Sequence, residues 1–183
     1  MKKWILRITI SVLLIPIIGM IGWYLVSFFP YLTELHEISK RGNQNIVVFY
    51  DKLKFLATTV ESEQGVRSYA MRQAYRSLVV VGKNKQSNVS LHANNALWLL
   101  ASYVHFDSHT VFGIWADCAL YGCGKGLSEA ARKYYGKSIE NLSDEELAGI
   151  VLLVRNPQGF GPNSEKTEEQ VNELLKKLKS ATS

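Results

Sequence analysis

The sequence predicts a mainly α-helical domain behind one N-terminal transmembrane helix. The first sign is residues 8–29, a run of 22 residues without a charged side chain. At about 1.5 Å per residue, a helix of that length crosses a hydrocarbon core of about 30 Å. Several later segments repeat apolar residues at helical spacing. Strand patterns are few, and neither internal repeats nor low-complexity segments occur, so one helical domain is expected.

Charged residues flank the apolar run unequally. Lys2, Lys3 and Arg7 precede it, and the next charge is Glu34. The positive-inside rule therefore predicts a cytoplasmic N-terminus, with the rest of the chain on the opposite side. A cleaved signal peptide is the alternative, but the run ends in aromatic residues rather than at a small-x-small site. We expect an uncleaved, single-pass anchor over residues 1–30.

The remainder is long enough for one domain. We expect a polar stem over residues 31–45 and a domain over residues 46–183. The chain carries a net charge of +5, and three of its cations precede the apolar run, which leaves +2 for the remainder. A nucleic-acid-binding domain would need a denser basic patch, so we exclude that class.

The first half of the domain contains three predicted helices. Residues 46–60 read as a helix, although the aliphatic start at 46–49 would also suit a short strand. Residues 66–81 read as a second helix, and residues 82–88 as a surface loop by composition. Residues 93–106 are strongly apolar and predict a buried helix.

Residues 114–137 predict a helix end, a glycine-rich turn and a second helix. The turn contains Gly122, Gly124 and Gly126. The following helix has its apolar residues at i, i+3, i+4 and i+7, which places them on one face: Leu127, Ala130, Ala131 and Tyr134. Cys118 and Cys123 flank the start of this turn. They form either a disulfide, which an oxidising compartment permits, or two buried thiols.

The last two predicted helices have clearer boundaries. Ser143 and Glu146 have the spacing of a capping box, and Asn156-Pro157 ends the helix that follows. The final helix covers residues 165–179, with one apolar stripe made of Val171, Leu174, Leu175 and Leu178.

Other chemistry-bearing residues read as structural. His105 and His109 are four apart but lack a third ligand, so we interpret them as surface histidines and predict no metal site. The aromatic side chains of Trp98, Tyr103 and Phe106 are interpreted as core rather than as a sugar-stacking platform.

The stretch from Val111 to Pro162 resembles the family 51 glycosyltransferases, the peptidoglycan transglycosylases. Residues 115–117 stand where the family has Tyr-Leu-Asn. Tyr121-Gly122-x-Gly124 and residues 130–137 (Ala-Ala-Arg-Lys-Tyr-Tyr-Gly-Lys) match its following run. Downstream, residues 142–150 and the prolines at 157 and 162 continue the match in order. The resemblance implies a lysozyme-like helical fold.

The family's catalytic motifs are poorly matched. Its first motif, E-D-x-x-F-x-x-H-x-G, carries the general base, and Glu61 in Glu61-Ser62-Glu63 is the candidate here. Its third motif, a basic pair followed by a glutamate, has no counterpart, and the glutamate of its fourth motif falls on Gly113. By resemblance, the substrate-binding positions are Ser90, Asn94, Asn95, Asp117, Gly122, Gly124 and Lys137.

The resemblance implies glycan-strand synthesis from lipid II at a bacterial inner membrane, with the domain in the periplasm. A divalent cation, Mg²⁺ or Mn²⁺, usually assists near the donor pyrophosphate. Two alternatives stay open. The domain is an inactive, membrane-tethered partner of other cell-wall enzymes, or it is a lytic transglycosylase, a class in which a catalytic glutamate precedes serine as Glu61 precedes Ser62.

Overall fold

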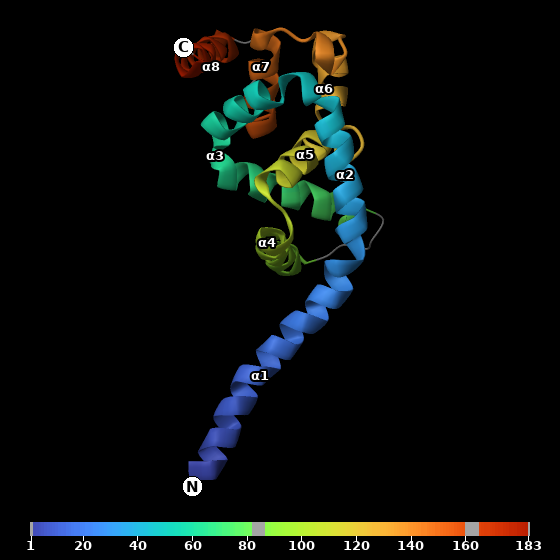
Figure 1. Cartoon of the computed structure of the whole chain (residues 1–183), viewed down its shortest axis with the longest axis vertical. Helices are drawn as coiled ribbons and strands as arrows, with labels where there is room; N and C mark the ends of the chain where they lie inside the picture. Colours follow the sequence, from blue (N-terminus) through green and yellow to red (C-terminus); the bar gives the residue numbers. More distant parts are fainter. Residues whose placement is uncertain (1, 82–86, 160–164, 183) are drawn as a thin grey trace. The chain divides into compact units, whose positions relative to one another are not determined.

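The computed structural model describes residues 2–81, 87–159 and 165–182, with side chains for 14–81, 87–159 and 166–181. The loop predicted over residues 82–88 and the aromatic-x-Pro match at 160–162 lie largely outside this range. Among the described residues every regular element is helical (Figure 1). The mainly α-helical prediction is confirmed. The chain divides into two compact units, Met1–Glu34 and Leu35–Ser183.

The first unit consists of α1 (Lys2–Ser27), the 3₁₀ turn η1 (Phe29–Tyr31) and the first residues of α2 (Leu32–Asn45). Pro16 lies inside α1. The described aliphatic side chains from Leu14 to Val26 are mostly exposed. This part of the chain is long and apolar enough to cross a membrane, as the sequence predicted.

The second unit begins earlier than the domain boundary expected from composition. Residues 31–45 were predicted as a polar stem, yet four residues of α2 are buried in the second unit: Leu35, Ile38, Ser39 and Gly42. Their spacing places them on one face of α2, and this face packs into the second unit as the apolar face of an amphipathic helix does. The polar residues between them lowered the mean hydropathy and hid this face.

A glycine pair sets the approach of α2 to α5 (Ser108–Cys118). A Cβ atom on Gly42 would overlap the carbonyl oxygen of Gly113, and a Cβ on Gly113 would overlap the carbonyl oxygen of Ser39. Neither position tolerates a side chain without separating the two helices. The fourth-motif position therefore lies inside a helix contact and has no room for a glutamate.

Helix α5 is the centre of the second unit, because every residue from Val111 to Cys118 is buried. It packs against α3 (Tyr50–Tyr75), which follows the short 3₁₀ turn η2 (Val47–Phe49) and continues into the π-helical turn η3 (Arg76–Val80). The strand alternative for residues 46–49 is wrong. The predicted helices over 46–60 and 66–81 fall mainly on the two segments of α3, which join at a kink, and their outer ends belong to η2 and η3.

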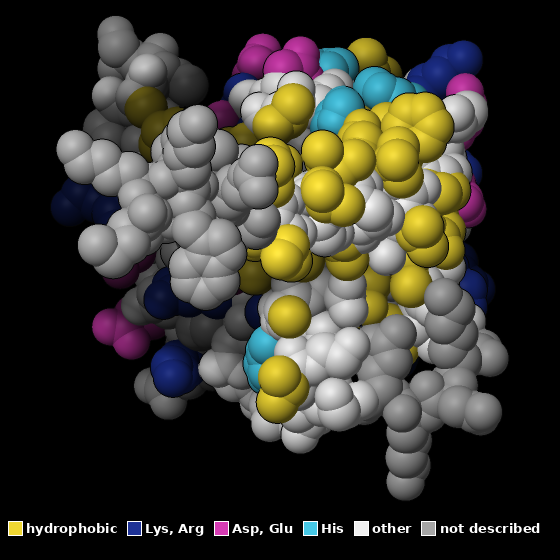
Figure 2. All heavy atoms as spheres, turned by 90° about the horizontal axis from the view of Figure 1, so that it is seen from below, with side chains coloured by type: hydrophobic (Ala, Val, Ile, Leu, Met, Phe, Trp, Pro, Cys, Tyr) yellow, Lys and Arg dark blue, Asp and Glu magenta, His cyan; other side chains and the backbone are white. Residues whose placement is uncertain are grey.

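Helix α4 (Asn88–His105) departs most from expectation. We predicted a buried helix, but within it only Trp98 and Ser102 are buried. Val89 and Val104 are each 80% exposed, and Leu100 and Tyr103 are more than half exposed. Figure 2 shows hydrophobic side chains gathered on the face seen from below, the side on which α4 lies within the second unit in Figure 1. Composition alone cannot separate a buried helix from one that exposes an apolar face.

The C-terminal helices follow the predicted pattern. After α6 (Gly126–Tyr135) and the 3₁₀ turn η4 (Ile139–Asn141), the capping box at Ser143 and Glu146 begins α7 (Asp144–Arg155). Ser143 Oγ accepts from the Glu146 amide, and Glu146 Oε2 accepts from the Ser143 amide. Helix α8 (Glu165–Thr182) packs against α7 and buries its predicted stripe.

Candidate functional site

The kink in α3 carries the candidate catalytic glutamate. Ser62, directly after Glu61, has φ 61° and ψ 162°, a backbone conformation that belongs essentially to glycine. Its Oγ accepts from the amide of Gly65 at 3.2 Å, so Ser62 caps the second segment of the helix. Strain of this kind costs about 1–3 kcal/mol and clusters at functional sites.

Glu61 lies on the inner side of this kink and is half-buried. A Cβ atom built on Gly65 would lie 3.2 Å from Glu61 Cβ and 3.5 Å from its Oε2. The carboxylate therefore folds over the first turn of the second segment. A larger residue than glycine at position 65 would displace it.

A cavity of about 270 Å³ opens beside the kink, lined by Glu63, Gln64, Arg67 and Tyr103. Sequence reasoning missed Arg67 and assigned Glu63 no role. The helical spacing of Glu63 and Arg67, four residues apart, was the available signal, because i and i+4 share a helix face. The kink thus offers two carboxylates, one folded over the backbone and one facing the cavity.

Arg67 joins the kink to α4. Its Nη1 donates to the carbonyl oxygens of Ser102 at 2.9 Å and Phe106 at 3.1 Å. Its guanidinium lies over the ring of Tyr103, 4.6 Å from the centroid. These contacts bury the side chain and place a fixed positive charge at the C-terminal end of α4, where the helix dipole favours a cation. Tyr103, predicted as core, instead lines the cavity.

Three predicted substrate-binding residues lie nearer the start of α4: Ser90, Asn94 and Asn95. Asn94 Nδ2 donates to the carbonyl oxygen of Ser90 at 2.9 Å, and Asn95 Oδ1 is buried without a protein partner. Asn95 is eight residues from Tyr103, which is about 12 Å along a helix. The structure does not bring these three residues next to the kink.

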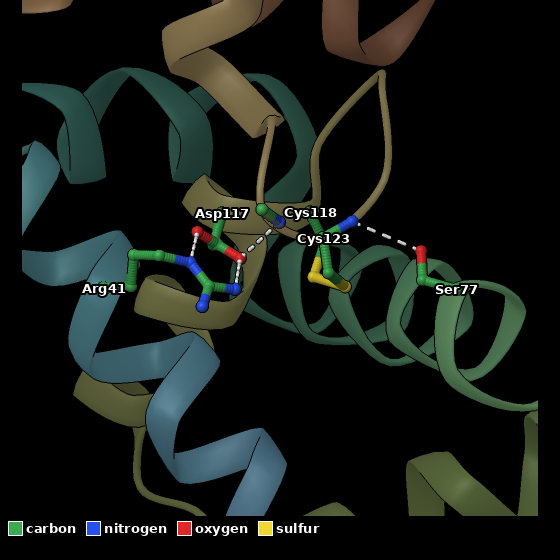
Figure 3. A network of polar contacts seen from close by, with 6 residues as sticks. Arg41, Ser77, Asp117, Cys118 and Cys123 are labelled. Atoms are coloured by element: carbon green, nitrogen blue, oxygen red, sulfur yellow. Dashed lines mark hydrogen bonds and ion pairs between the residues drawn. A yellow bond between two sulfur atoms is a disulfide. The ribbon is translucent and has the colours of Figure 1, made fainter.

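Asp117 is enclosed by the glycine turn (Figure 3). Arg41 donates from Nε to Oδ1 at 2.8 Å and from Nη2 to Oδ2 at 2.7 Å, and the Gly124 amide donates to Oδ2 at 2.8 Å. Asp117 is 3% exposed. Both carboxylate oxygens of Asp117 are therefore engaged in hydrogen bonds within the protein. Its predicted contact with substrate stays a prediction.

The turn itself is fastened to α5 and to the end of α3. Cys118 and Cys123 form a disulfide, and the Cys123 amide donates to Ser77 Oγ at 3.3 Å (Figure 3). Gly122 and Gly124 have φ of 84° and 89°, which requires glycine at both positions. With these contacts, the turn is a rigid structural unit. The substrate-binding role predicted for the two glycines is untested.

Lys137 lies between α6 and α7. Its Nζ is 2.7 Å from Glu146 Oε1, and this contact, with the Ser143 amide, lowers the pKa of the Glu146 carboxyl below its ordinary value. Lys137 is thus paired within the protein. Its predicted role toward substrate also stays a prediction.

The described residues gather no group of three His, Cys, Asp or Glu side chains that could hold a metal ion. His105 and His109 are exposed; His105 is the last residue of α4, and His109 lies in the first turn of α5. The side chains present thus do not fit a protein-held divalent cation.

A family model described as Transglycosylase matches residues 57–179. The chain belongs to the transglycosylase family. The match covers the kink, α4 and the glycine turn, and the helical elements of the described residues agree with the lysozyme-like helical architecture of that family. No curated protein and no solved structure shows a significant match to the chain.

Proposed function

We propose that this transglycosylase-family protein is a membrane-anchored peptidoglycan glycosyltransferase that extends glycan strands from lipid II. The strained kink at Ser62 carries the proposal. It fixes Glu61 at the bend of α3, two residues before Glu63, which lines an open cavity together with the buried Arg67. Backbone strain is retained where it positions a reacting group.

In the proposed reaction, the 4-hydroxyl of an acceptor sugar attacks the donor sugar at C1. The new C1–O bond forms as the bond from C1 to the lipid pyrophosphate breaks, and Glu61 takes the hydroxyl proton. A positioned base contributes about 10²–10⁴-fold to such a step. Arg67 supplies a fixed positive charge on the cavity wall, where its hydrogen bonds to the end of α4 hold it in place.

The described side chains gather no protein-held site, so no step of the proposal is assigned to a metal.

The proposed location is the periplasmic side of a bacterial inner membrane. Lys2, Lys3 and Arg7 before the apolar run support a cytoplasmic N-terminus. A reporter fused after Ser183 should be active only in the periplasm. Cytoplasmic activity would rule out the proposal, because lipid-linked glycans are polymerised on the other side.

A second candidate is an inactive, membrane-tethered partner of cell-wall enzymes. One observation favours it: Gly113, at the position of the fourth-motif glutamate, lies inside the contact between α2 and α5. Charge stabilisation is usually the largest single contribution to catalysis, and a lost glutamate removes part of it.

Polymerisation by the purified full chain separates these candidates. The proposal predicts glycan polymer from lipid II in detergent micelles. Binding of lipid II without polymer would support the scaffold candidate, and cleavage of preformed strands would support the lytic alternative. Either result would overturn the proposed transfer activity.

A further inference from the structure

A second cavity, of about 450 Å³, lies on α2, η2 and the start of α5, all within the second unit. Tyr50, one of its lining residues, is eleven residues before Glu61, which is about 16 Å along α3. Seven of its eight lining residues precede the family match, and only His109 falls inside it. Its volume is in the range of small-molecule sites. This cavity is therefore separate from the kink and from the family's shared region.

The lining of this cavity is basic and contains no carboxylate. Lys40 and His36 lie four residues apart on one face of α2, and His109 faces them from α5. Lys40 forms no ion pair within the described part of the chain. The nearest carboxylate of α5, Asp107, accepts from the Thr110 amide at 2.7 Å and caps that helix. The cavity thus offers the ammonium group of Lys40 and the imidazole of His36 to an anion, while His109 Nδ1 lies 3.3 Å from the Asn43 amide nitrogen.

Two polar atoms at this cavity are buried without a partner in the protein. They are Asn43 Oδ1 and Tyr50 OH. The amide nitrogen of Asn43 lies 3.3 Å from His109 Nδ1 and donates at 3.4 Å to Ser39 Oγ and to the carbonyl oxygen of His109, which leaves the oxygen as the free end. A buried polar atom without a hydrogen bond costs about 1–3 kcal/mol, so a ligand that supplied the bond would gain that energy.

The charged groups and the unpartnered oxygen of this cavity need different features in a ligand. Lys40 and the imidazole of His36 favour an anion, whereas Asn43 Oδ1 accepts only and needs an N–H or O–H donor. Inorganic phosphate would satisfy the first group and present mainly acceptor oxygens to the second. A neutral sugar would satisfy Asn43 and Tyr50 and leave Lys40 without a counter-charge. The ring of Tyr50, which lies 5.1 Å from that of His109 at a tilt of 34°, adds an aromatic side chain to the lining, of the kind that a sugar ring can cover.

We propose that this cavity binds a sugar that carries a phosphate or carboxylate group. The charge of the ligand lies at Lys40, and its hydroxyl or amide hydrogens meet Asn43 Oδ1. The proposal goes beyond transfer at the kink and does not depend on it, since the two sites share no lining residue.

Isothermal titration of the full chain in detergent micelles tests the proposal. The probes are N-acetylglucosamine 1-phosphate, N-acetylmuramic acid, neutral N-acetylglucosamine and inorganic phosphate. At least one of the first two should bind about tenfold more tightly than both of the others, because a charge-assisted hydrogen bond contributes about 1.5–3 kcal/mol. The two charged sugars distinguish a phosphate ligand from a carboxylate ligand.

Variants locate the binding. Lys40→Gln and Tyr50→Phe should each weaken binding of the charged sugar by about fivefold or more. Lys176→Gln, which removes another exposed lysine, on α8, should leave it unchanged. Lys40 is exposed, so the Lys40→Gln variant should fold normally. Thermal unfolding checks that both cavity variants are folded.

Three results would overturn the proposal. They are equal binding of inorganic phosphate, no measurable binding of either charged sugar, or binding that survives both cavity substitutions. A failure to polymerise lipid II would contradict the proposed transfer at the kink and would leave the proposed sugar binding at this cavity unaffected.

Discussion

Replacement of Ser62 by glycine and by alanine should change stability in different directions. Both substitutions remove the hydroxyl that caps the second segment of α3. Only glycine removes the backbone strain, because φ of 61° with ψ of 162° is unfavourable for every residue with a Cβ atom. The pair therefore separates the strain at the kink from its cap.

The magnitudes follow from these two contributions. Loss of a serine N-cap costs about 1 kcal/mol for alanine and a few tenths for glycine. Glycine also costs about 0.4–1 kcal/mol through the unfolded chain, and it recovers about 1–3 kcal/mol of strain. Ser62→Gly should therefore be more stable than Ser62→Ala by about 1–3 kcal/mol. It should equal or exceed the wild type.

Thermal unfolding of the full chain in micelles, followed by circular dichroism, measures this difference. Ser143 provides the matched control, because it caps α7 with an ordinary φ of −72°. Glycine at position 143 has no strain to relieve and should fall below the wild type. If Ser62→Gly is no more stable than Ser62→Ala, the kink is not strained and the argument for a positioned Glu61 fails.

Three further predictions concern packing, charge and the disulfide. Gly113→Ala should lower the free energy of unfolding by about 1–3 kcal/mol, because its Cβ would overlap the Ser39 carbonyl, and an unchanged melting temperature would show that α2 and α5 are not in close contact. Glu146→Gln should destabilise by about 0.2–1 kcal/mol at pH 7. Because the native carboxyl has a lowered pKa, the wild-type advantage should be present above the ordinary value of 4.5 and disappear as the pH falls through the lower native value; pH-independent loss would contradict this. Cys118 and Cys123 should resist alkylation in denaturant until a reductant is added, and reduction should cost about 2 kcal/mol for so short a loop; prompt labelling of both would show free thiols.

Local signals in the sequence determined the parts of the fold that were predicted well. The capping box at Ser143 and Glu146 joins residues three apart, so its pattern is complete within the sequence. The stripe of α8 from Val171 to Leu178 is likewise a local pattern. The capping box and the stripe depend only on the spacing of residues along one helix, and this spacing can be read from the sequence.

Contacts between distant residues could not be predicted. Asp117 was assigned to the substrate by resemblance, and no local pattern indicates its ion pair with Arg41, 76 positions away. Glu63 lines the cavity directly after the kink at Ser62, and no composition rule predicts a serine at positive φ. The exposed face of α4 was missed for the same reason, since burial depends on which helices are neighbours.

The rate of lipid II polymerisation by Glu61→Gln, relative to wild type, tests the central claim most directly. Glutamine keeps the shape of the side chain and removes its basicity, so folding should be nearly unchanged while turnover falls by about 10²-fold or more. Glu63→Gln, two residues along and facing the cavity, should stay close to the wild-type rate. Polymerisation that survives Glu61→Gln, or a loss confined to Glu63→Gln, would contradict the assignment of Glu61 as the base.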